Sequence, residues 1–393
     1  MIHYTENMAG HQVPAIRNGA NTWLLGRRGT IEQIPTLSLW LVRRAVISHL
    51  SNKGFFTPLG PDDLYHLTVL TSMACQARCP YCLQNEDVAD DGTVTRLAAE
   101  FMTPATIRAT IAFAKRMSAK QGKRGVKLLL FGGEPLLNLT GCIALLEGMQ
   151  PELDSAGIIT NGVLFDRNTA CLLGKLGLHR VQITFDGKRK DHDRMRVLAN
   201  GRGTYDTILA NLEAIDDLEE PCQRTLRVNV TAANIYGLDE LLFDLAMSLT
   251  AQRYTLNLAL VDELGFGWTG GLRKSDQVTA RLVEVYQLAG RLGFQVLPPT
   301  EMYCPYCSDS FGQGGAVVDQ VGRLVSCWDS AGRPELGVGT VWGGYKPAST
   351  HNDRWVMCGS GALNEQPEPS YDPSQLSRTQ FEIAVRQMMA LAS

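Results

Sequence analysis

The sequence predicts an α/β protein built on a partial (β/α)6 barrel of the TIM-like type, and three observations indicate it. Apolar runs typical of strands alternate with helical runs, six times in series, from Leu67 onward. Three closely spaced cysteines follow the first of these strands, where the loops of such a barrel build a site. A Gly-rich region with four more cysteines follows the sixth unit and indicates a small second domain.

Composition is that of an ordinary globular protein. The 393 residues are 45% hydrophobic and 20% charged, which is enough for one large domain and a smaller one. A net charge of −3 gives no reason to expect nucleic acid or an anionic membrane as a partner. The most apolar N-terminal segment, 37–50, contains Arg43 and Arg44 and is too short to span a bilayer. Ten cysteines, seven of them in metal-type spacings, with no signal pattern, predict a cytoplasmic protein.

Residues 1–65 are expected to form a segment of their own. Two short strands, at 22–25 and 29–34, surround a Gly-containing turn, and 37–49 has helical periodicity. A linker follows, marked by Gly54, Pro58, Gly60 and Pro61. A hairpin and a helix suit either a module that docks a partner or peptide, or a cap that closes the bottom of the barrel.

Residues 66–296 are expected to form the barrel. Strands are predicted at 67–72, 126–131, 155–159, 180–185, 224–231 and 253–260. Helices are predicted near 104–120, 138–149, 166–177, 204–219, 237–248 and 277–292. Six units instead of eight leave the barrel partly open, and an open side admits a large substrate.

The three cysteines Cys75, Cys79 and Cys82 have C-x₃-C-x₂-C spacing. Three thiolates can hold three irons of a [4Fe–4S] cluster, which leaves the fourth iron open to a small molecule. The alternative is a structural zinc site, with His66 as the fourth ligand.

A second motif, Gly132-Gly133-Glu134-Pro135, ends the second strand. Paired glycines let a ligand lie against the backbone, and the neighbouring carboxylate can receive an ammonium group. The motif alone is weak, because strand-to-helix turns often have this composition. Its place one unit after the cysteine loop makes it informative.

Together these two motifs resemble the radical S-adenosylmethionine (radical SAM) superfamily. The resemblance implies that the three cysteines hold a [4Fe–4S] cluster and that S-adenosylmethionine chelates its open iron. Reductive cleavage then gives a 5′-deoxyadenosyl radical, which removes a hydrogen atom from the substrate. It also implies that Tyr81 lies against the adenine side of the cofactor and that Gly133 and Glu134 meet its methionyl amino group.

Later motifs resemble the peptide- and protein-modifying branch of that superfamily. They are Ile158 to Gly162, Gln182 to Gly187, His192-Asp193-x-x-Arg196 and Gly201 to Tyr205. By resemblance, Thr184 (where Ser is more usual) and Arg196 contact the cofactor's ribose and carboxylate, and a guanidinium suits a carboxylate because it donates two parallel hydrogen bonds. The implied cofactor-binding set is Tyr81, Gly132, Gly133, Glu134, Asn161, Thr184, Asp186 and Arg196.

Residues 297–360 are expected to form the second domain, around a hairpin of 317–319 and 323–325. It resembles the auxiliary-cluster domains called SPASM, in the shorter form called twitch. The resemblance implies a second [4Fe–4S] cluster held by Cys304, Cys307, Cys327 and Cys358, saturated by four thiolates and suited to electron transfer or structure. A zinc site at the same cysteines is the alternative. Residues 361–393 are predicted to be a linker and a final helix, 375–391, packing on the barrel.

The remaining cysteines, Cys142, Cys171 and Cys222, have no partner spacing and are interpreted as core or surface thiols. No catalytic acid or base can be assigned, since Asp262, Glu263 and Asp309 are candidates by position alone.

Three enzyme hypotheses differ in the substrate that they assign. The favoured one is a maturase that abstracts hydrogen from a ribosomally made precursor peptide and leaves a carbon–carbon or thioether crosslink or an epimerised residue. The others are a small-molecule dehydrogenase or rearrangement enzyme of the twitch type and a sulfatase-type protein maturase. The resemblance implies an external electron donor of the flavodoxin or ferredoxin type.

Overall fold

The structure is a computed structural model that describes residues 2–27, 30–57, 62–89, 93–261, 263, 267–272, 275–296, 304–307, 312–347, 354–356 and 385–386. None of the helices in these ranges is both long and apolar enough to cross a membrane.

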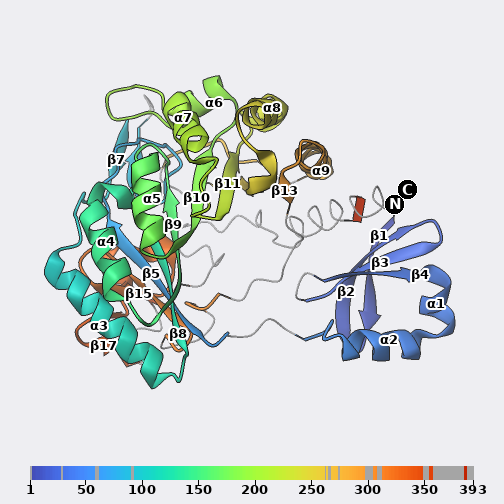
Figure 1. Ribbon diagram of the computed structural model, residues 1–393. Coiled ribbons are helices and arrows are strands. Elements are labelled where there is room, and N and C mark those ends of the chain that lie inside the picture. The colour runs from blue at the N-terminus through green and yellow to red at the C-terminus, as the bar shows by residue number, and fades with distance from the viewer. Residues whose placement is uncertain are drawn as a thin grey trace.

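Parallel strands and covering helices form the largest part of the molecule (Figure 1). The strands are β5 (Leu64–Ser72), β8 (Gly125–Gly132), β9 (Leu153–Thr160), β10 (Leu178–Phe185), β11 (Gln223–Val230) and β12 (Tyr254–Leu260). The helices that follow them are α3 (Pro104–Lys120), α4 (Leu139–Gly148), α5 (Arg167–Lys175), α7 (Tyr205–Ile215), α8 (Leu238–Ser248) and α9 (Asp276–Arg291). The predicted series of six units is confirmed, with boundaries within a few residues.

Local sequence signals explain where these helices begin. The hydroxyl of Thr103 accepts the backbone N–H of Thr106 at the start of α3, and Asp166 accepts that of Thr169 at the start of α5. Such N-caps satisfy backbone donors that have no partner within the helix. Alternate strand residues such as Leu128 and Val181 then pack against the helices in one continuous apolar core.

The order of the described strands keeps the barrel open. One sheet runs β13-β12-β11-β10-β9-β8-β5-β14-β15-β16-β17, so β5 and β12 do not pair with each other. Strand β13 (Gln295–Val296) pairs with β12, and β14 (Gly315–Val318) adds in parallel to β5. The partly open barrel is therefore confirmed, and its first strand carries the C-terminal region directly.

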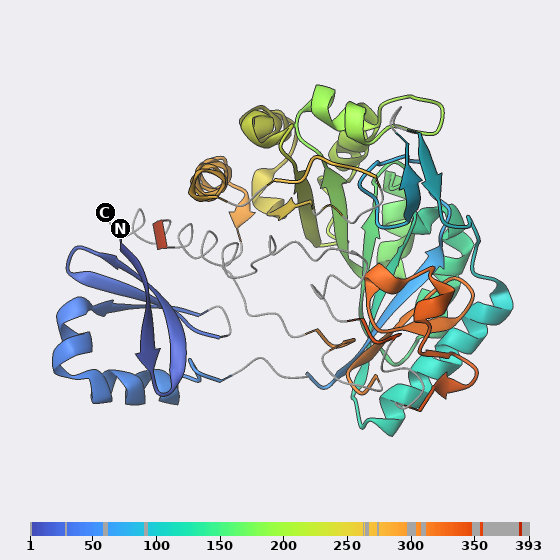
Figure 2. The ribbon, with the colours of Figure 1, turned by 180° about the vertical axis from the view of Figure 1, so that it is seen from behind.

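That C-terminal region begins with the predicted hairpin. Strand β14 pairs antiparallel with β15 (Arg323–Val325), with Val317 opposite Val325. Two short strands follow, β16 (Gly339–Thr340) and β17 (Gly344–Tyr345). They extend the same sheet beyond its β5 edge (Figure 2).

Short elements outside the predicted series complete the barrel domain and the C-terminal region. They are the ribbon of β6 (Asn85–Val88) and β7 (Val94–Arg96), helix α6 (Arg189–Met195), and the 3₁₀ turns η1 (Pro135–Asn138), η2 (Ile235–Gly237), η3 (Ala251–Arg253), η4 (Trp328–Ser330) and η5 (Pro334–Leu336). The β6–β7 ribbon directly follows the cysteine loop, and α6 lies between β10 and α7 in the chain.

The N-terminal segment is larger than the sequence predicts. Four antiparallel strands, β1 (Ile2–Met8), β2 (His11–Asn18), β3 (Asn21–Leu25) and β4 (Ile31–Pro35), pair in chain order. The sequence predicts one helix here, but the chain forms two, α1 (Thr36–Leu41) and α2 (Arg43–Asn52), with Val42 non-helical between them. The prediction of a single helix is therefore wrong. This N-terminal module has an apolar core separate from that of the barrel (Figure 1).

Of the predicted C-terminal helix, the structure describes residues 385–386, and Val385 makes a packing contact. It is helical and buried against Ile16 and Trp23 of the N-terminal module. The expectation that this helix packs on the barrel is therefore wrong at this residue. The rest of 361–393 lies outside the described residues.

Candidate functional site

The cysteine loop begins directly after β5, at the carboxyl end of the parallel sheet. Its backbone pairs with a segment far along the chain, because Arg78 N–H donates to Val197 O at 2.8 Å and Ala199 N–H to Gln76 O at 2.9 Å. The Arg78 guanidinium donates to Cys75 O at 2.8 Å and to Ala77 O at 3.0 Å. These bonds fix the loop from both sides, as a site built on rigid elements requires.

The spacing of the three thiols suits a cluster better than a single ion. Zinc with bonds of about 2.3 Å holds its thiolate sulfurs about 3.8 Å apart. The donor atoms of Cys75, Cys79 and Cys82, all described, do not gather within 4.8 Å of one another. The proposed fourth zinc ligand, His66, instead pairs through Nε2 with Asp62 at 2.9 Å, at the opposite end of β5.

Burial makes these thiols poor acids until a positive centre binds them. Burial raises the pKa of Cys79 to about 12, Asp186 and the two neighbouring thiols add to the rise, and Arg196 opposes it. Burial also raises the pKa of Cys75. A metal centre would supply the charge that turns such thiols into thiolate ligands.

Gly132 and Gly133 are required by the approach of two backbones. A Cβ on Gly132, whose φ is +135°, would lie 2.1 Å from Ser72 O, and one on Gly133 would lie 2.4 Å from Ala74 O. The N–H groups of Gly133 and Glu134 donate to Ser72 O and Ala74 O at 2.8 and 2.9 Å. The sequence motif suggested that these glycines leave space for a ligand. In the structure, backbone atoms at the start of the cysteine loop occupy that space at the Cβ positions.

Glu134 is fully buried, with its carboxylate held by the end of β9. Its Oε1 accepts from Thr160 Oγ1 at 2.8 Å and from Leu136 N–H at 3.1 Å, and its Oε2 accepts from Asn161 N–H at 2.8 Å. Burial raises the pKa of Glu134, while these donors oppose the rise. A carboxylate offers about four acceptor positions, so one remains for a further donor.

A second buried group joins the cysteine loop to β10. The Tyr81 hydroxyl donates to Asp186 Oδ2 at 2.5 Å and accepts from Arg196 Nη1 at 3.2 Å and Asn229 Nδ2 at 3.1 Å. Arg196 Nη1 lies 3.9 Å from Asp186 Oδ1. Asp186 Oδ1 and Arg196 Nε have no hydrogen-bond partner among the described atoms. Buried polar atoms that lack a hydrogen-bond partner can bind a polar ligand.

Burial and neighbouring charges shift the pKa values of all three members of this group. Burial raises the pKa of Asp186, against the pull of Arg196 and Tyr81. The pKa of Tyr81 is raised by burial and by Asp186. Burial lowers the pKa of Arg196, but Tyr81, Cys79 and Asp186 outweigh it and leave a net rise. We therefore expect a guanidinium with a permanent charge at this position.

His192 holds Asp186 in position directly and Arg196 through Thr204. Its Nδ1 accepts from Asp186 N–H at 3.3 Å, and its Nε2 lies 2.9 Å from Thr204 Oγ1, which donates to Arg196 O at 2.7 Å. Because the single Thr204 proton goes to that carbonyl, Nε2–H of His192 must be the donor to Thr204. Burial and Arg196 lower the pKa of His192 well below its ordinary value, which fits this neutral tautomer.

This neutral histidine predicts a loss of stability in acid. Below about pH 6.5 the unfolded chain binds a proton at His192 that the folded chain does not, so stability falls as pH falls through that value. From pH 7.5 to 5.5 the wild type should lose about 1.3 kcal/mol more than a His192→Asn variant does. Urea denaturation at both pH values measures this difference in stability. A His49→Asn variant, which changes an exposed histidine, is the control. Equal pH dependence of wild type and His192→Asn would refute it.

Not every predicted residue joins these two groups. Asn161 does, since Nδ2 lies 3.8 Å from Cys75 Sγ and Oδ1 accepts from Gln76 Nε2 at 3.3 Å. Thr184 is buried near the end of β10, two residues before Asp186, and among the described residues no hydrogen bond joins its side chain to the others. Asp262, Asp309 and Cys358 lie outside the described residues. The carboxylate of Glu263 accepts from the N–H groups of Gly270 and Gly271, both at 2.8 Å.

Three residues at this site were missed by sequence reasoning. Asn229 contacts Tyr81, Trp268 packs edge-on against the Tyr81 ring at 5.8 Å, and Arg96 lies beside the thiols of Cys82 and Cys75. A signal existed for Asn229 alone: it is a polar residue near the carboxyl end of an apolar strand. Trp268 and Arg96 stand in segments with no motif.

The segments that carry Cys307 and Cys327 lie close together in the C-terminal region. The rings of Tyr306 and Trp328, neighbours of Cys307 and Cys327, have centroids 6.2 Å apart. The three donor atoms of Cys304, Cys307 and Cys327, like those of the first loop, do not gather within 4.8 Å. Val356 N–H donates to Ser326 Oγ at 2.8 Å, which ties the chain two residues before Cys358 to the residue before Cys327.

A family model described as the Radical SAM superfamily matches residues 69–230. The GTP 3′,8-cyclase of Xanthomonas campestris pv. campestris (strain 8004) is 29% identical over 174 residues, which are 43% of this chain and 46% of that protein. The chain thus matches about half the length of this curated relative.

Two solved structures share the fold. The structure titled "Native anSMEcpe with bound AdoMet" has a TM-score of 0.59 and 14% identity, covering 84% of this chain and 99% of that one. The same protein "with bound AdoMet and Cp18Cys peptide" has a TM-score of 0.58 and 14% identity, covering 84% and 98%.

Proposed function

We propose that the chain is a radical SAM enzyme that modifies a ribosomally made peptide, because residues 69–230 match the model of the Radical SAM superfamily. The observation that carries the proposal is the buried group of Tyr81, Asp186 and Arg196 against the cysteine loop, with polar atoms still unpartnered. The superfamily implies S-adenosylmethionine and a [4Fe–4S] cluster as cofactors.

The residues of the site divide between these cofactors. Cys75, Cys79 and Cys82 would hold the cluster, and their wide spacing fits it. Glu134, with one acceptor position free, would receive the amino group of S-adenosylmethionine, and Arg196 would donate to its carboxylate. When bound, the two cofactors supply reductive cleavage to a 5′-deoxyadenosyl radical that abstracts hydrogen. Asp186 and His192 would hold Tyr81 and Arg196 in place.

Arg96 is expected to tune the cluster. Burial lowers the pKa of Arg96, but the Cys82 and Cys75 thiolates outweigh it, which places a cation beside the sulfurs. A cation stabilises the more negative reduced cluster, so Arg96→Gln should lower the reduction potential, by about 60 mV for each 1.4 kcal/mol lost. A redox titration followed by EPR measures this. Arg108→Gln, at an exposed position of α3, should leave the potential unchanged. An unshifted potential in Arg96→Gln would exclude the effect.

We also propose a second cluster in the C-terminal region, held by Cys304, Cys307, Cys327 and Cys358. Support comes from the Tyr306–Trp328 contact and from the hydrogen bond of Val356 to Ser326. Because β14 pairs with β5, two neighbouring strands of one sheet connect the cysteine regions. We propose an electron-transfer role for this cluster, because four thiolates would leave no iron open.

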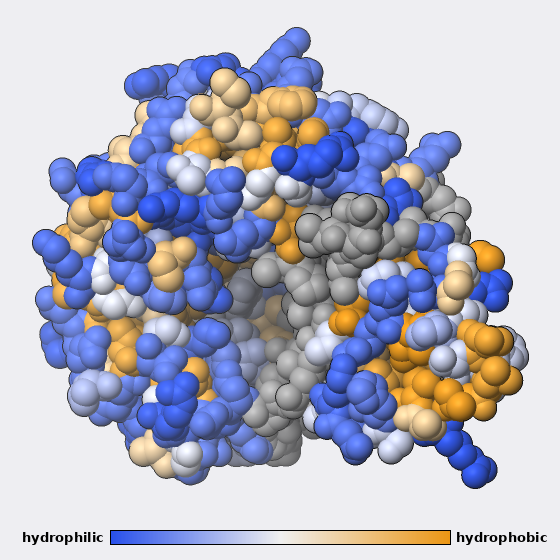
Figure 3. Space-filling model, turned by 45° about the vertical axis from the view of Figure 1, so that its right-hand side comes forward, coloured by the Kyte–Doolittle hydropathy of each residue, from blue (hydrophilic) through white to orange (hydrophobic). Residues whose placement is uncertain are grey.

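Two features support a peptide substrate. The barrel is open between β5 and β12 within the described strands, so an extended chain can enter. The N-terminal module has its own core and presents an apolar face on α1, with Leu37, Trp40, Leu41 and Val42 exposed (Figure 3). Such a face suits an apolar segment of a precursor peptide. The anSMEcpe complex with a peptide is a fold-level analogy.

A small-molecule substrate is the second candidate. The similarity to GTP 3′,8-cyclase favours it. Lys127 and Arg180 also line a pocket of about 110 Å³ at the amino ends of the strands, where a charged molecule can bind. That pocket lies at the end of the barrel opposite the cysteine loop, which is why we favour the peptide.

Mass spectrometry of a candidate precursor peptide tests the proposal. The anaerobically reconstituted enzyme, S-adenosylmethionine and a flavodoxin- or ferredoxin-type donor should yield 5′-deoxyadenosine and a peptide lighter by a few hydrogens, or epimerised at unchanged mass. A variant lacking Leu37 and Trp40 side chains (both to Ala) should form 5′-deoxyadenosine normally without peptide but modify the peptide slowly. Modification of nucleotides or sugars but of no peptide would favour the second candidate.

A further inference from the structure

Three side chains capable of binding a metal meet at the amino ends of two neighbouring strands. His179 is the second residue of β10, and Glu220 and Cys222 precede β11. The register pairs Arg180 with Gln223, so His179 and Cys222 are neighbours across the two strands although 43 residues separate them in sequence. The cysteine loop lies at the other end of these strands.

Their donor atoms lie close enough for one ion. Nδ1 of His179 is 3.4 Å from Cys222 Sγ and 3.4 Å from Glu220 Oε1, and all three donors lie within 4.8 Å of one another. A tetrahedral zinc ion with bonds of about 2.3 Å to sulfur and about 2.0 Å to nitrogen or oxygen holds its ligands about 3.3 to 3.6 Å apart. The described residues contain no other such trio of His, Cys, Asp or Glu.

The loop that leads from α7 into β11 is held in the shape this arrangement needs. Glu220 Oε2 accepts from Cys222 N–H at 2.9 Å, which leaves Oε1 facing His179. The buried guanidinium of Arg224 donates to Pro221 O and Asp216 O, both at 3.0 Å, and to Leu218 O. A loop fixed in this way keeps its ligands oriented without an ion, and such support strengthens metal binding.

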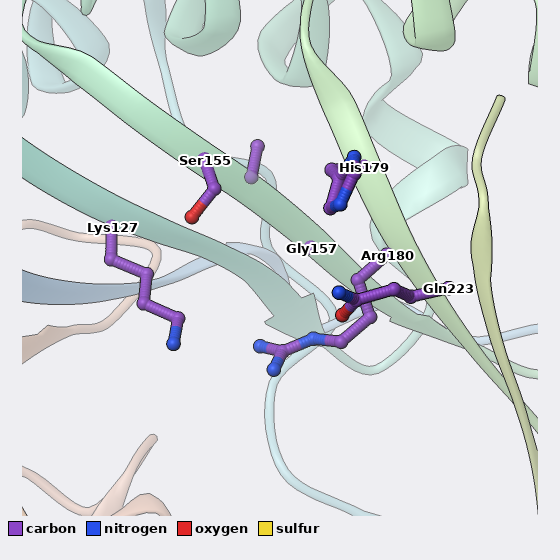
Figure 4. Close-up of a pocket in the computed structure, with 7 residues that line it drawn as sticks. Lys127, Ser155, Gly157, His179, Arg180 and Gln223 are labelled. Atoms are coloured by element: carbon purple, nitrogen blue, oxygen red, sulfur yellow. The ribbon is translucent and has the colours of Figure 1, made fainter. Parts of the chain in front are cut away.

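We propose that His179, Glu220 and Cys222 form a zinc-binding site separate from both cysteine clusters. A thiolate, an imidazole and a carboxylate are the donors zinc takes, whereas calcium and magnesium take oxygen ligands. The side chains of His179 and Glu220 are 43% and 45% exposed, so the fourth position is open to water. Figure 4 shows His179 and Arg180 pointing to different sides of β10. The Cys222 thiol proton is released as the ion binds.

Zinc binding by the reconstituted holoprotein tests the site. After removal of loose metal, the wild type dialysed against ZnCl₂ should retain one zinc per chain, with an absorption-edge spectrum of one sulfur and two or three nitrogen or oxygen ligands. Cys222→Ser and His179→Gln should each bind zinc at least tenfold more weakly. Cys171→Ser, which removes a thiol from α5, should bind as the wild type does.

The same experiment separates this site from the clusters. Iron and sulfide content should be equal in all four proteins, because none of the changes touches a cluster cysteine. Added ZnCl₂ should raise the melting temperature of the wild type and Cys171→Ser but not of Cys222→Ser. Equal zinc affinity of wild type and Cys222→Ser, or a spectrum with three or four sulfur ligands, would overturn the assignment, even if S-adenosylmethionine cleavage proceeds as proposed.

Discussion

An Arg196→Met variant is expected to lose about 3 kcal/mol of unfolding free energy and to bind S-adenosylmethionine at least tenfold more weakly. Arg196 is 7% exposed and Asp186 is 0% exposed, so removing the guanidinium leaves a buried carboxylate without its positive partner. The Tyr81 hydroxyl also loses the donor at 3.2 Å. Breaking a buried pair from one side costs more than the pair contributes.

Two further variants separate the causes of this effect. Arg194→Met removes an exposed arginine of α6 that pairs with Asp191, and its stability should change by less than about 0.5 kcal/mol. Changing Asp186→Asn in the Arg196→Met background should restore part of the lost stability, because the uncompensated charge is gone. Urea denaturation and isothermal titration with S-adenosylmethionine measure the two effects. A loss under about 1 kcal/mol in Arg196→Met would contradict this picture.

A Glu134→Gln variant is expected to bind S-adenosylmethionine at least tenfold more weakly while it keeps its iron. The carboxylate accepts three hydrogen bonds, from Thr160 Oγ1, Asn161 N–H and Leu136 N–H. A glutamine has one oxygen and one NH₂ group, so its NH₂ must face a donor in a buried place. Losing a hydrogen bond to a charged group costs about 1.5 to 3 kcal/mol.

Glu147→Gln on α4 is the matched control, because Glu147 is exposed. It should leave both stability and S-adenosylmethionine affinity unchanged. Iron analysis shows whether the cluster survives in each variant, and isothermal titration gives the affinity. Wild-type affinity in Glu134→Gln would show that this carboxylate is only structural.

Much of the barrel could be predicted because its sequence signals are local. Strand β8 is a nearly continuous apolar run, and α3 begins at a threonine cap followed by Pro104. The N-terminal strands β1 and β2 were missed for a local reason too. They are largely polar, and Pro14 stands in β2 opposite Thr5, where a sequence pattern argues against a strand.

The site was predicted where motifs stand at strand ends and missed where tertiary structure brings residues together. Tyr81, Asp186 and Arg196 are up to 115 residues apart, yet their motifs marked them, and they do form one group. Arg96 ends the short strand β7 and Trp268 lies in an irregular segment, and no periodicity in the sequence predicts the path of either. Cys222 was interpreted as a surface thiol because the strand register that brings it beside His179 cannot be read from spacing.

Iron and sulfide per chain, measured after anaerobic reconstitution, test the central claim most directly. The wild type should hold about eight irons and the Cys75→Ala/Cys79→Ala/Cys82→Ala variant about four, since each [4Fe–4S] cluster carries four. The variant should form no 5′-deoxyadenosine. About four irons falling to none, with a second zinc per chain retained beyond the one expected at His179, Glu220 and Cys222, would mean that Cys304, Cys307, Cys327 and Cys358 hold zinc. An unchanged iron content in the variant would contradict the assignment of the first cluster.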